Sequence, residues 1–301
     1  FHKAQSSLKK FKENRLKRGT VVAHRSINTS GKDEAEILRE MATRALTALG
    51  GIEKLVSRGD RVVIKPNISW NRAPEFAANT NPHLVAALTS LCLDAGASKV
   101  KVMDHTCSSN PKPSYKISGI EDAARRSGAE PVFVDGSRFR ELTIPGGKVL
   151  KSWAFNDAFV LKDEVDVLIN VPIAKHHSTS RLTMALKNVM GMVGWDRGRL
   201  HKDIHPKIAD LNRVVKVDLT VLDAYRVLRR HGPTGGRLDD VDSSLDGAGR
   251  IVISTDPVAV DSYGATLFGL GGEDIGFIRE AHEAGIGEID YRLHGFEEIT
   301  I

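Results

Sequence analysis

Short apolar runs that alternate with helical patterns are the feature of this sequence that most constrains its fold. The runs are rich in β-branched residues and begin at Arg61, Lys99, Val165, Val217 and Arg250. Between them lie segments with helical spacing of apolar residues, most clearly 34–49 and 82–94. We therefore expect an α/β fold with a mostly parallel sheet, helices on both of its faces and Rossmann-like layers.

The length and charge of the chain suit a globular protein with a basic start. Its 301 residues are 41% hydrophobic, which predicts one α/β unit over residues 19–301, with two lobes of about 19–150 and 151–301 as the alternative. The net charge is +5, and residues 3–18 hold seven basic side chains against one acid. We expect residues 1–18 to be a basic arm or the remnant of a processed leader, which leaves a cytoplasmic and an exported location both open.

Several functional classes are disfavoured by what the sequence lacks. It has no apolar run long enough to span a membrane and no basic, aromatic-rich stripe, so nucleic acid is not an expected partner. It has no dinucleotide-binding glycine motif, no P-loop and no nucleophile elbow. Cys92 and Cys107 are too few for a four-thiolate cluster, and we expect them to be free thiols, with a disulfide between them as the alternative.

Polar side chains follow most of the predicted strands, at the point where each strand ends. They are Lys65 with Asn67, Asp104 with His105, Asn170 with Lys175, Asp223 and Asp256. Ligands bind at the carboxyl edge in open α/β sheets, and these groups should converge there if the strands are parallel. A single aspartate also suits a turn or a helix N-cap, as Asp256 before Pro257 illustrates.

The segment 170–205 concentrates histidine and lysine. A buried strand over 165–171 should end at Pro172, because proline cannot donate to a strand ladder. A loop at the carboxyl edge should then carry Lys175, His176 and His177.

A helix is predicted over 182–193, where apolar residues recur at spacings of three and four. Lys187 and Asn188 lie off this apolar stripe, so Lys187 either faces the cleft or is an ordinary solvated lysine. A second helix should begin near Pro206, with His205 close to its N-cap.

The groups gathered at this edge suit acid–base chemistry on a small anionic ligand. Clustered amines attract a carboxylate or phosphate and lower one another's pKa. The predicted substrate-binding residues are Lys65, Asn67, Lys175, Asn188, Asp223 and Asp256. Histidine moves protons near neutral pH, and lysine can serve as a base or hold a cofactor. The predicted catalytic residues are Lys187, His177, His105, Asp104 and His205.

A divalent metal is an open alternative at the same edge, and the identity of any cofactor stays open. Imidazole suits divalent transition metals, and the candidate ligands are His177, His201 and His205. The sequence has no His-Glu-x-x-His motif, so these ligands would have to converge from separate loops.

Six short motifs together resemble one known family. They are Ile64-Lys65-Pro66-Asn67, Thr80-Asn81-Pro82, Asn170-Val171-Pro172 with Lys175 and His177, Leu186-Lys187-Asn188 with Gly191, His205 with Ile208 to Asn212, and Ser254 to Asp261. Over residues 20–270 the chain resembles the domain-of-unknown-function 362 family. Many members of that family carry a ferredoxin-type module, so the resemblance implies a ferredoxin-type redox partner. This chain lacks the cysteine-rich module, and we expect no iron–sulfur cluster in it.

A more distant resemblance is to the N-terminal domain of lactate racemase, a nickel-pincer enzyme. There a histidine at a strand end is followed ten positions later by the lysine that holds the cofactor, and His177 and Lys187 have this spacing. Two functions follow as hypotheses. One is a racemase- or isomerase-like enzyme that uses acid–base or metal-assisted chemistry, and the other is a non-catalytic module that binds an anion or a redox partner.

Overall fold

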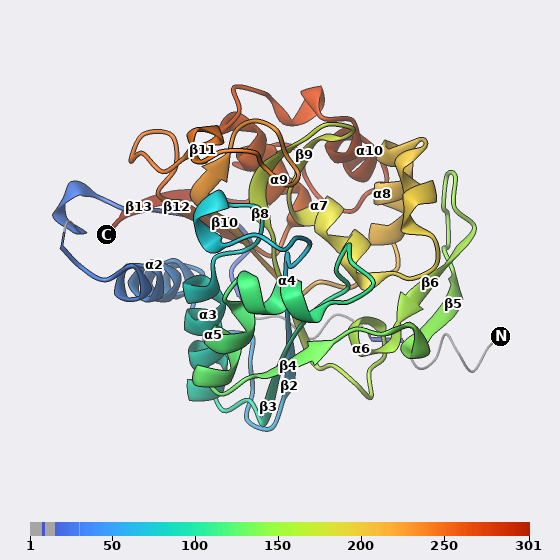
Figure 1. Ribbon diagram of the computed structural model, residues 1–301, viewed down its shortest axis with the longest axis horizontal. Helices are drawn as coiled ribbons and strands as arrows, with labels where there is room; N and C mark the ends of the chain where they lie inside the picture. The colour runs from blue at the N-terminus through green and yellow to red at the C-terminus, as the bar shows by residue number, and fades with distance from the viewer. Residues whose placement is uncertain (1–7, 10–15, 30) are drawn as a thin grey trace.

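The central sheet joins strands from both ends of the chain (Figure 1). The computed structural model describes residues 8–9, 16–29 and 31–301, so most of the predicted basic arm lies outside the described residues. These residues form an eleven-stranded sheet and a separate two-stranded hairpin. The main path of the sheet runs, in spatial order, through β13 (Phe296–Thr300), β1 (Thr20–His24), β12 (Arg250–Ser254), β10 (Leu219–Leu228), β7 (Val167–Val171), β2 (Arg61–Pro66), β3 (Lys99–Asp104) and β4 (Glu130–Phe133).

Five adjacent strands form the parallel part of this sheet. β10, β7, β2, β3 and β4 all run in one direction, which confirms the expected mostly parallel α/β sheet. Along β2, Val62 and Ile64 enter the core on one face, and Val63 enters the core on the other. Successive residues of a strand face opposite sides, so strands covered on both faces appear as continuous apolar runs in the sequence.

The strand that begins at Arg250 was expected to be parallel, and this prediction is wrong. β12 runs antiparallel to both β10 and β1. A parallel neighbour needs a long crossover, usually a helix, whereas an antiparallel neighbour is reached by a return loop. The connection from β10 to β12 holds only η7 (Leu238–Asp240) and the two-residue strand β11 (Val241–Asp242), so the chain turns back without a crossover helix.

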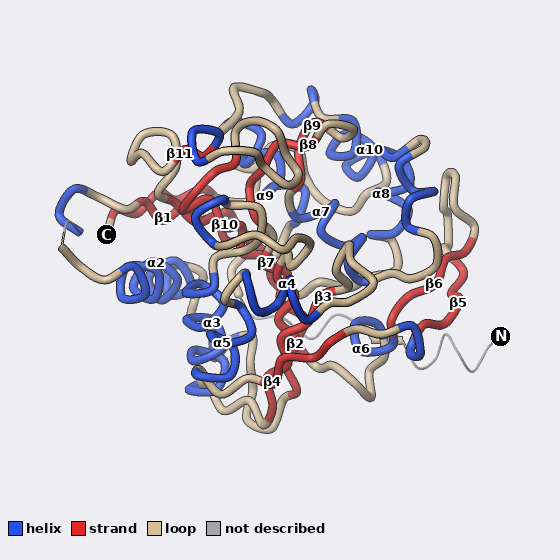
Figure 2. The backbone as a smooth tube through the Cα atoms, in the orientation of Figure 1, coloured by secondary structure: helices blue, strands red, loops and turns tan. Residues whose placement is uncertain are grey.

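Helical layers cover both faces of the sheet (Figure 2). One layer consists of α2 (Glu34–Ala48), α3 (Pro82–Asp94) and α5 (Ile120–Arg126). The other consists of α7 (Ala185–Asn188), α8 (Ile204–Asn212), α9 (Pro257–Thr266) and α10 (Gly276–Glu283). The remaining short elements are α4 (Lys112–Ile117), α6 (Asp157–Val160) and the hairpin of β5 (Phe139–Thr143) and β6 (Ser152–Asn156). Within the described ranges, no helix is both long and apolar enough to cross a bilayer.

Local signals set the ends of the helices that were predicted well. The side chain of Asn81 caps α3 by accepting a hydrogen bond from the backbone N–H of His83. Pro82 occupies the first turn, where its missing N–H costs nothing. Gly96 follows the helix with φ of 99°, a conformation that favours glycine. The observed helix, Pro82–Asp94, therefore matches the predicted range.

The segment after β7 differs from the predicted loop. Lys175, His176 and His177 belong to a further strand, β8 (Ile173–His177), which forms a hairpin with β9 (Arg181–Thr183). β10 is ten residues long and extends beyond β7, so it continues to pair with β8 after Pro172 has interrupted the ladder. Backbone groups in a buried place need such partners, and the extended β10 provides them.

The helix predicted over residues 182–193 is also wrong in extent. β9 occupies its start, α7 forms a single turn, and the 3-10 helix η5 (Val189–Met192) follows. The apolar spacing was misleading because residues 182–194 are all buried, whatever their conformation. An apolar stripe indicates a helix only where the intervening residues face solvent.

The buried carboxylate of Asp210 should be a large contributor to stability. From α8 it accepts hydrogen bonds of 2.7–2.8 Å from the backbone N–H groups of Lys148, Val149 and Leu150, and it thereby anchors the β5–β6 hairpin. We expect Asp210→Ala to lower the free energy of unfolding by about 1–3 kcal/mol, because buried donors lose their acceptor. Denaturant unfolding measures this change.

Asp94→Ala is the matched control, because this carboxylate forms an ion pair with Arg39 in which both side chains are more than half exposed. Exposed pairs contribute at most about 1 kcal/mol. Equal losses in the two variants would contradict the anchoring role of Asp210.

Candidate functional site

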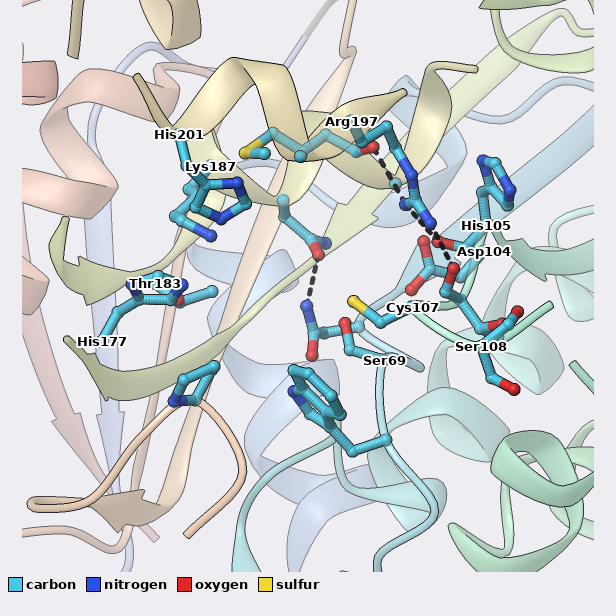
Figure 3. A pocket seen from close by; sticks show the side chains of 18 of the residues that line it. Ser69, Asp104, His105, Cys107, Ser108, His177, Thr183, Lys187, Arg197 and His201 are labelled. Carbon is cyan, nitrogen blue, oxygen red and sulfur yellow. Dashed lines mark hydrogen bonds between the residues drawn. The ribbon is translucent and has the colours of Figure 1, made fainter. Parts of the chain in front are cut away.

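A cavity of about 590 Å³ lies at the carboxyl ends of β2, β3 and β8 (Figure 3). Lys65 and Asn67 reach it from the end of β2, and the segment 104–109 reaches it from the end of β3. The β8–β9 hairpin contributes Lys175, His177 and Thr183, and α7 contributes Lys187 and Asn188. The segment 195–201 forms another wall. Strand ends and one short helix thus surround the same space.

A chain of hydrogen bonds links the buried polar residues beneath the cavity. Lys175 Nζ donates to Asn67 Oδ1 at 2.9 Å, and Asn67 Nδ2 donates to Asn188 Oδ1 at 3.0 Å. The same oxygen accepts from Lys65 Nζ at 2.8 Å, and Asn188 Nδ2 donates to Asn170 Oδ1 at 2.8 Å. Asn188 therefore ties the helix α7 to the ends of β2 and β7.

Lys65, at one end of this chain of hydrogen bonds, also forms an ion pair. Lys65 Nζ lies 2.7 Å from Asp104 Oδ1, and both side chains are about 1% exposed. The other carboxylate oxygen, Oδ2, accepts a hydrogen bond of 2.6 Å from the backbone N–H of Ile68. Gly191 packs directly against the pair, since a Cβ there would lie 1.9 Å from Asp104 Oδ1. Only glycine allows the backbone to approach so closely.

Three further cations line the cavity without a carboxylate partner among the described residues. Lys175 donates only to Asn67 and to the carbonyl oxygen of Ala78, and Arg197 donates only to backbone carbonyl groups. Lys187 Nζ has no hydrogen-bond or ion-pair partner in the described ranges. Asp104 and Asp196 are the carboxylates of the lining. With all lysines protonated, four cations face two anions in the described part of the cavity wall.

Burial changes the acid–base behaviour of the two unpaired lysines. Burial, together with the charge of Lys187, lowers the pKa of Lys175 to about 7. Burial likewise lowers the pKa of Lys187 to about 8. Taking an ammonium group out of water disfavours its charged form, and neighbouring cations add to the effect. Both amines therefore gain and lose protons close to neutral pH.

The histidines of the cavity are held as neutral rings. His177 Nδ1 accepts the backbone N–H groups of Thr179 and Ser180, which leaves the proton on Nε2. Burial and the charge of Lys187 lower the pKa of His177 to about 3. The ring of His201 stacks on that of His177 with centroids 5.9 Å apart, and burial lowers its pKa as well.

His105 has the opposite arrangement of its ring nitrogens. Its Nδ1 lies 2.8 Å from the carbonyl oxygen of Val193 and donates to it, so Nε2 of the neutral ring can accept a proton. Burial and the charge of Arg197 lower the pKa of His105. The cavity therefore has one imidazole suited to donating a hydrogen bond and one suited to accepting.

Three predicted site residues lie elsewhere. His205 stacks on Phe277 at a centroid distance of 6.2 Å and does not line the cavity. Asp223 is inside β10 instead of at its end, where burial raises its pKa to about 6 and its carboxylate accepts from the N–H groups of Asn81 and Tyr225.

Asp256 is the N-cap of α9, where it accepts from the N–H groups of Val258 and Ala259. Because β12 is antiparallel to its neighbours, its end lies at the opposite edge of the sheet. The prediction that Asp256 joins the other polar strand ends is therefore wrong.

The three proposed metal ligands are not gathered around one point. His177 and His201 are neighbours in the cavity, but His205 is separate from it. Among the residues that the structure describes, no group of three or more His, Cys, Asp and Glu side chains is arranged to hold a metal ion.

Other cavity residues were not found from the sequence. Arg197 lies in a segment without any regular apolar pattern, and Thr183 resembles an ordinary strand threonine. The Thr183 hydroxyl and Trp70 Nε1 are buried atoms without a hydrogen-bond partner in the described chain. Buried polar groups are normally paired, so such atoms indicate a missing ligand or water. No sequence signal distinguishes them from structural residues.

The chain is similar to known proteins. The chain is 27% identical over 252 residues to a thylakoid-associated protein of Synechocystis sp., a match that covers 78% of this chain and 71% of that protein. A crystal structure of a protein from Thermotoga maritima is 13% identical and aligns with a TM-score of 0.44. That alignment covers 83% of this chain, which spans 57% of the other chain's length. The family described as domain of unknown function DUF362 matches residues 62–266, more than half of the sequence, and the chain therefore belongs to this family.

Proposed function

We propose that the cavity binds a small anion, a carboxylate or a phosphate, and performs acid–base chemistry on it. The observation that carries this proposal is the set of three buried or partly buried cations, Lys175, Lys187 and Arg197, that have no carboxylate partner among the described residues. Buried charges are normally paired, because an isolated ion loses its hydration without compensation. A bound anion supplies the missing partner.

The unpartnered donors support the same proposal. Lys187 is 9% exposed and Thr183 is 4% exposed, yet the ammonium and the hydroxyl group have no hydrogen-bond partner among the described residues. Both side chains line the cavity, and Figure 3 shows them directed toward the same space. The oxygen atoms of a carboxylate or phosphate accept several hydrogen bonds at once, which matches donors that converge from different elements.

The proton chemistry follows from the surroundings of each group. With a pKa of about 8 in the free protein, Lys187 has a minor free-amine form near neutral pH, and this form can remove a proton from a ligand whose charged group is held by Lys175 and Arg197. The neutral ring of His177 can donate its Nε2 proton as a hydrogen bond to an oxygen that becomes negative. A base and a hydrogen-bond donor of this kind both assist removal of a proton next to a carboxylate, as in a racemase or isomerase.

Substitution of Lys187 should weaken anion binding without loss of stability. Lys187→Met retains the apolar stem of the side chain and removes the ammonium group, so the affinity for sulfate or phosphate should fall at least about tenfold, or about 1.4 kcal/mol. The melting temperature of the free protein should stay unchanged or rise, because an unpaired buried charge is lost. Titration calorimetry and thermal unfolding measure the two effects.

Lys54→Met is the matched control, because Lys54 is exposed and lies outside the cavity. Its anion affinity should equal that of the unaltered protein. Unchanged sulfate affinity in Lys187→Met would refute the proposed site.

The affinity for sulfate should fall as the pH rises past the pKa values of the two lysines. These values are about 7 for Lys175 and about 8 for Lys187, and a bound anion favours the charged form of each. Above these pKa values, binding must take up protons, so the affinity should fall by up to about tenfold per pH unit for each lysine. Sulfate keeps its own charge throughout this range.

Calorimetry in two buffers of different ionisation enthalpy measures the proton uptake directly. In Lys187→Met, any remaining binding should depend less steeply on pH, since only Lys175 then titrates. A sulfate affinity that is the same on both sides of these pKa values would show that the lysines do not contact the anion.

Catalysis itself predicts exchange of a carbon-bound proton. Small carboxylates incubated with the protein in D2O should lose the proton next to the carboxylate, which proton NMR detects, and Lys187→Met should lose this exchange. Binding of the same carboxylates without any exchange would instead favour the second function, a module that binds an anion without turnover.

A further inference from the structure

Cys107 lies at the rim of the cavity and belongs to two hollows at once. It follows β3 in the loop that also carries Thr106 and Ser108, and its thiol is free and exposed. A second hollow of about 440 Å³ adjoins the cavity, and both are lined by Ser69, Trp70, Cys107 and Ser108. Figure 3 shows the sulfur atom of Cys107 turned toward the space that Lys187 also faces.

The lysines of the cavity lie within electrostatic reach of this sulfur atom. Burial lowers the pKa of Lys187, and a thiolate at position 107 would oppose that change because it lies close enough to stabilise the ammonium form. A thiolate there would likewise oppose the lowering of the pKa values of Lys65 and Lys175, of which burial is the largest cause. An anion attracted to the lysines is therefore brought close to the thiol, because clefts lined by one sign of charge concentrate ions of the other sign.

A second observation, independent of the cysteine, indicates that a ligand occupies this space. The hydroxyl group of Thr183, in a side chain that is 4% exposed, lines the same cavity and has no hydrogen-bond partner among the described residues. Donors from β9 and α7 can hold the charged end of a ligand, while the thiol faces it from the loop after β3.

We propose that Cys107 is a nucleophile that takes small anionic carbon electrophiles, which the lysines of the cavity orient by their charged group. This inference rests on the proposed anion site and names a class of ligand for it. The thiol gives its proton to solvent, the sulfur atom forms a bond to the electrophilic carbon, and the leaving group departs with the electron pair of its own bond. No oxidant or reductant takes part. In this displacement the leaving group lies on the side of the carbon opposite the sulfur atom, so it departs into the cavity, away from Cys107.

Two alkylating reagents that differ in charge test this inference. Iodoacetate and iodoacetamide have the same reacting carbon and the same iodide leaving group, but only iodoacetate is an anion. For Cys107 in the folded protein, the ratio of the iodoacetate rate to the iodoacetamide rate should exceed the ratio for the urea-unfolded chain by at least about tenfold. Mass spectrometry of peptides assigns the adduct, and Cys92, which is fully buried, should stay unmodified in the folded protein.

Variants and a competing anion test whether the rate ratio depends on the cavity or on the general reactivity of the thiol. Sulfate should slow the reaction with iodoacetate in a saturable manner, and Lys187→Met should lower the rate ratio toward that of the unfolded chain. Lys54→Met should keep the ratio of the unaltered protein. A rate ratio equal in the folded and unfolded states would overturn the assignment of Cys107.

The two proposals can fail separately. If calorimetry detects sulfate binding that depends on Lys187 but the rate ratio is not raised, the anion site stands and the role of Cys107 is wrong. If sulfate does not bind at all, the proposed function fails, and the inference about Cys107 fails with it.

Discussion

The buried ion pair between Lys65 and Asp104 is the interaction on which the candidate site depends. It joins the ends of β2 and β3, and the same ammonium group donates to Asn188 on α7, so three elements meet at one nitrogen atom. Buried pairs are stable only where the remaining hydrogen-bonding capacity is satisfied. Most of that capacity is used here, because Asp104 Oδ2 accepts from the N–H of Ile68 and Lys65 Nζ also donates to the carbonyl oxygen of Pro66. Apart from its ion pair with Lys65, Asp104 Oδ1 has no hydrogen-bond partner among the described residues.

Lys65 differs from the other cations of the cavity because it has a carboxylate in contact. Lys175 is as deeply buried as Lys65, but its acceptors are an amide and a backbone carbonyl group, neither of which carries a negative charge. Burial therefore acts on the pKa of Lys175 without a neighbouring carboxylate in contact to compensate. The fold thus pairs Lys65 with Asp104. It leaves Lys175 without a carboxylate in contact, so the protonation of Lys175 can change when a ligand binds.

The fold class and part of the site follow from the sequence, because they depend on local or periodic signals. β2, β3 and α3 were predicted nearly to the residue, since apolar runs and a capped helix with Pro82 at its start are local features. The meeting of Lys65 and Asp104 follows from the rule that parallel strands end at one edge. The family resemblance was also correct, since it rested on a combination of several motifs.

Other parts could not be predicted, because they depend on tertiary pairing. The direction of β12 is set by its neighbours, and the strand position of Lys175 exists because β10 extends past β7. Asp256 looked like a site residue by position, but the antiparallel direction of its strand places it at the other edge. Arg197 and Thr183 reach the cavity from segments whose sequences carry no pattern that separates them from ordinary loop and strand residues.

The close approach of Gly191 to the ion pair has a consequence for how salt acts on this protein. The backbone covers Asp104 and Lys65 at a distance that no side chain would permit, and both groups are nearly inaccessible to solvent. Dissolved ions screen exposed charges over about 8–10 Å at physiological ionic strength, but they cannot enter such a covered place. Ionic strength should therefore weaken the surface ion pairs of the chain, such as Arg39 with Asp94, while the field of the Lys65–Asp104 pair beneath the cavity stays nearly constant.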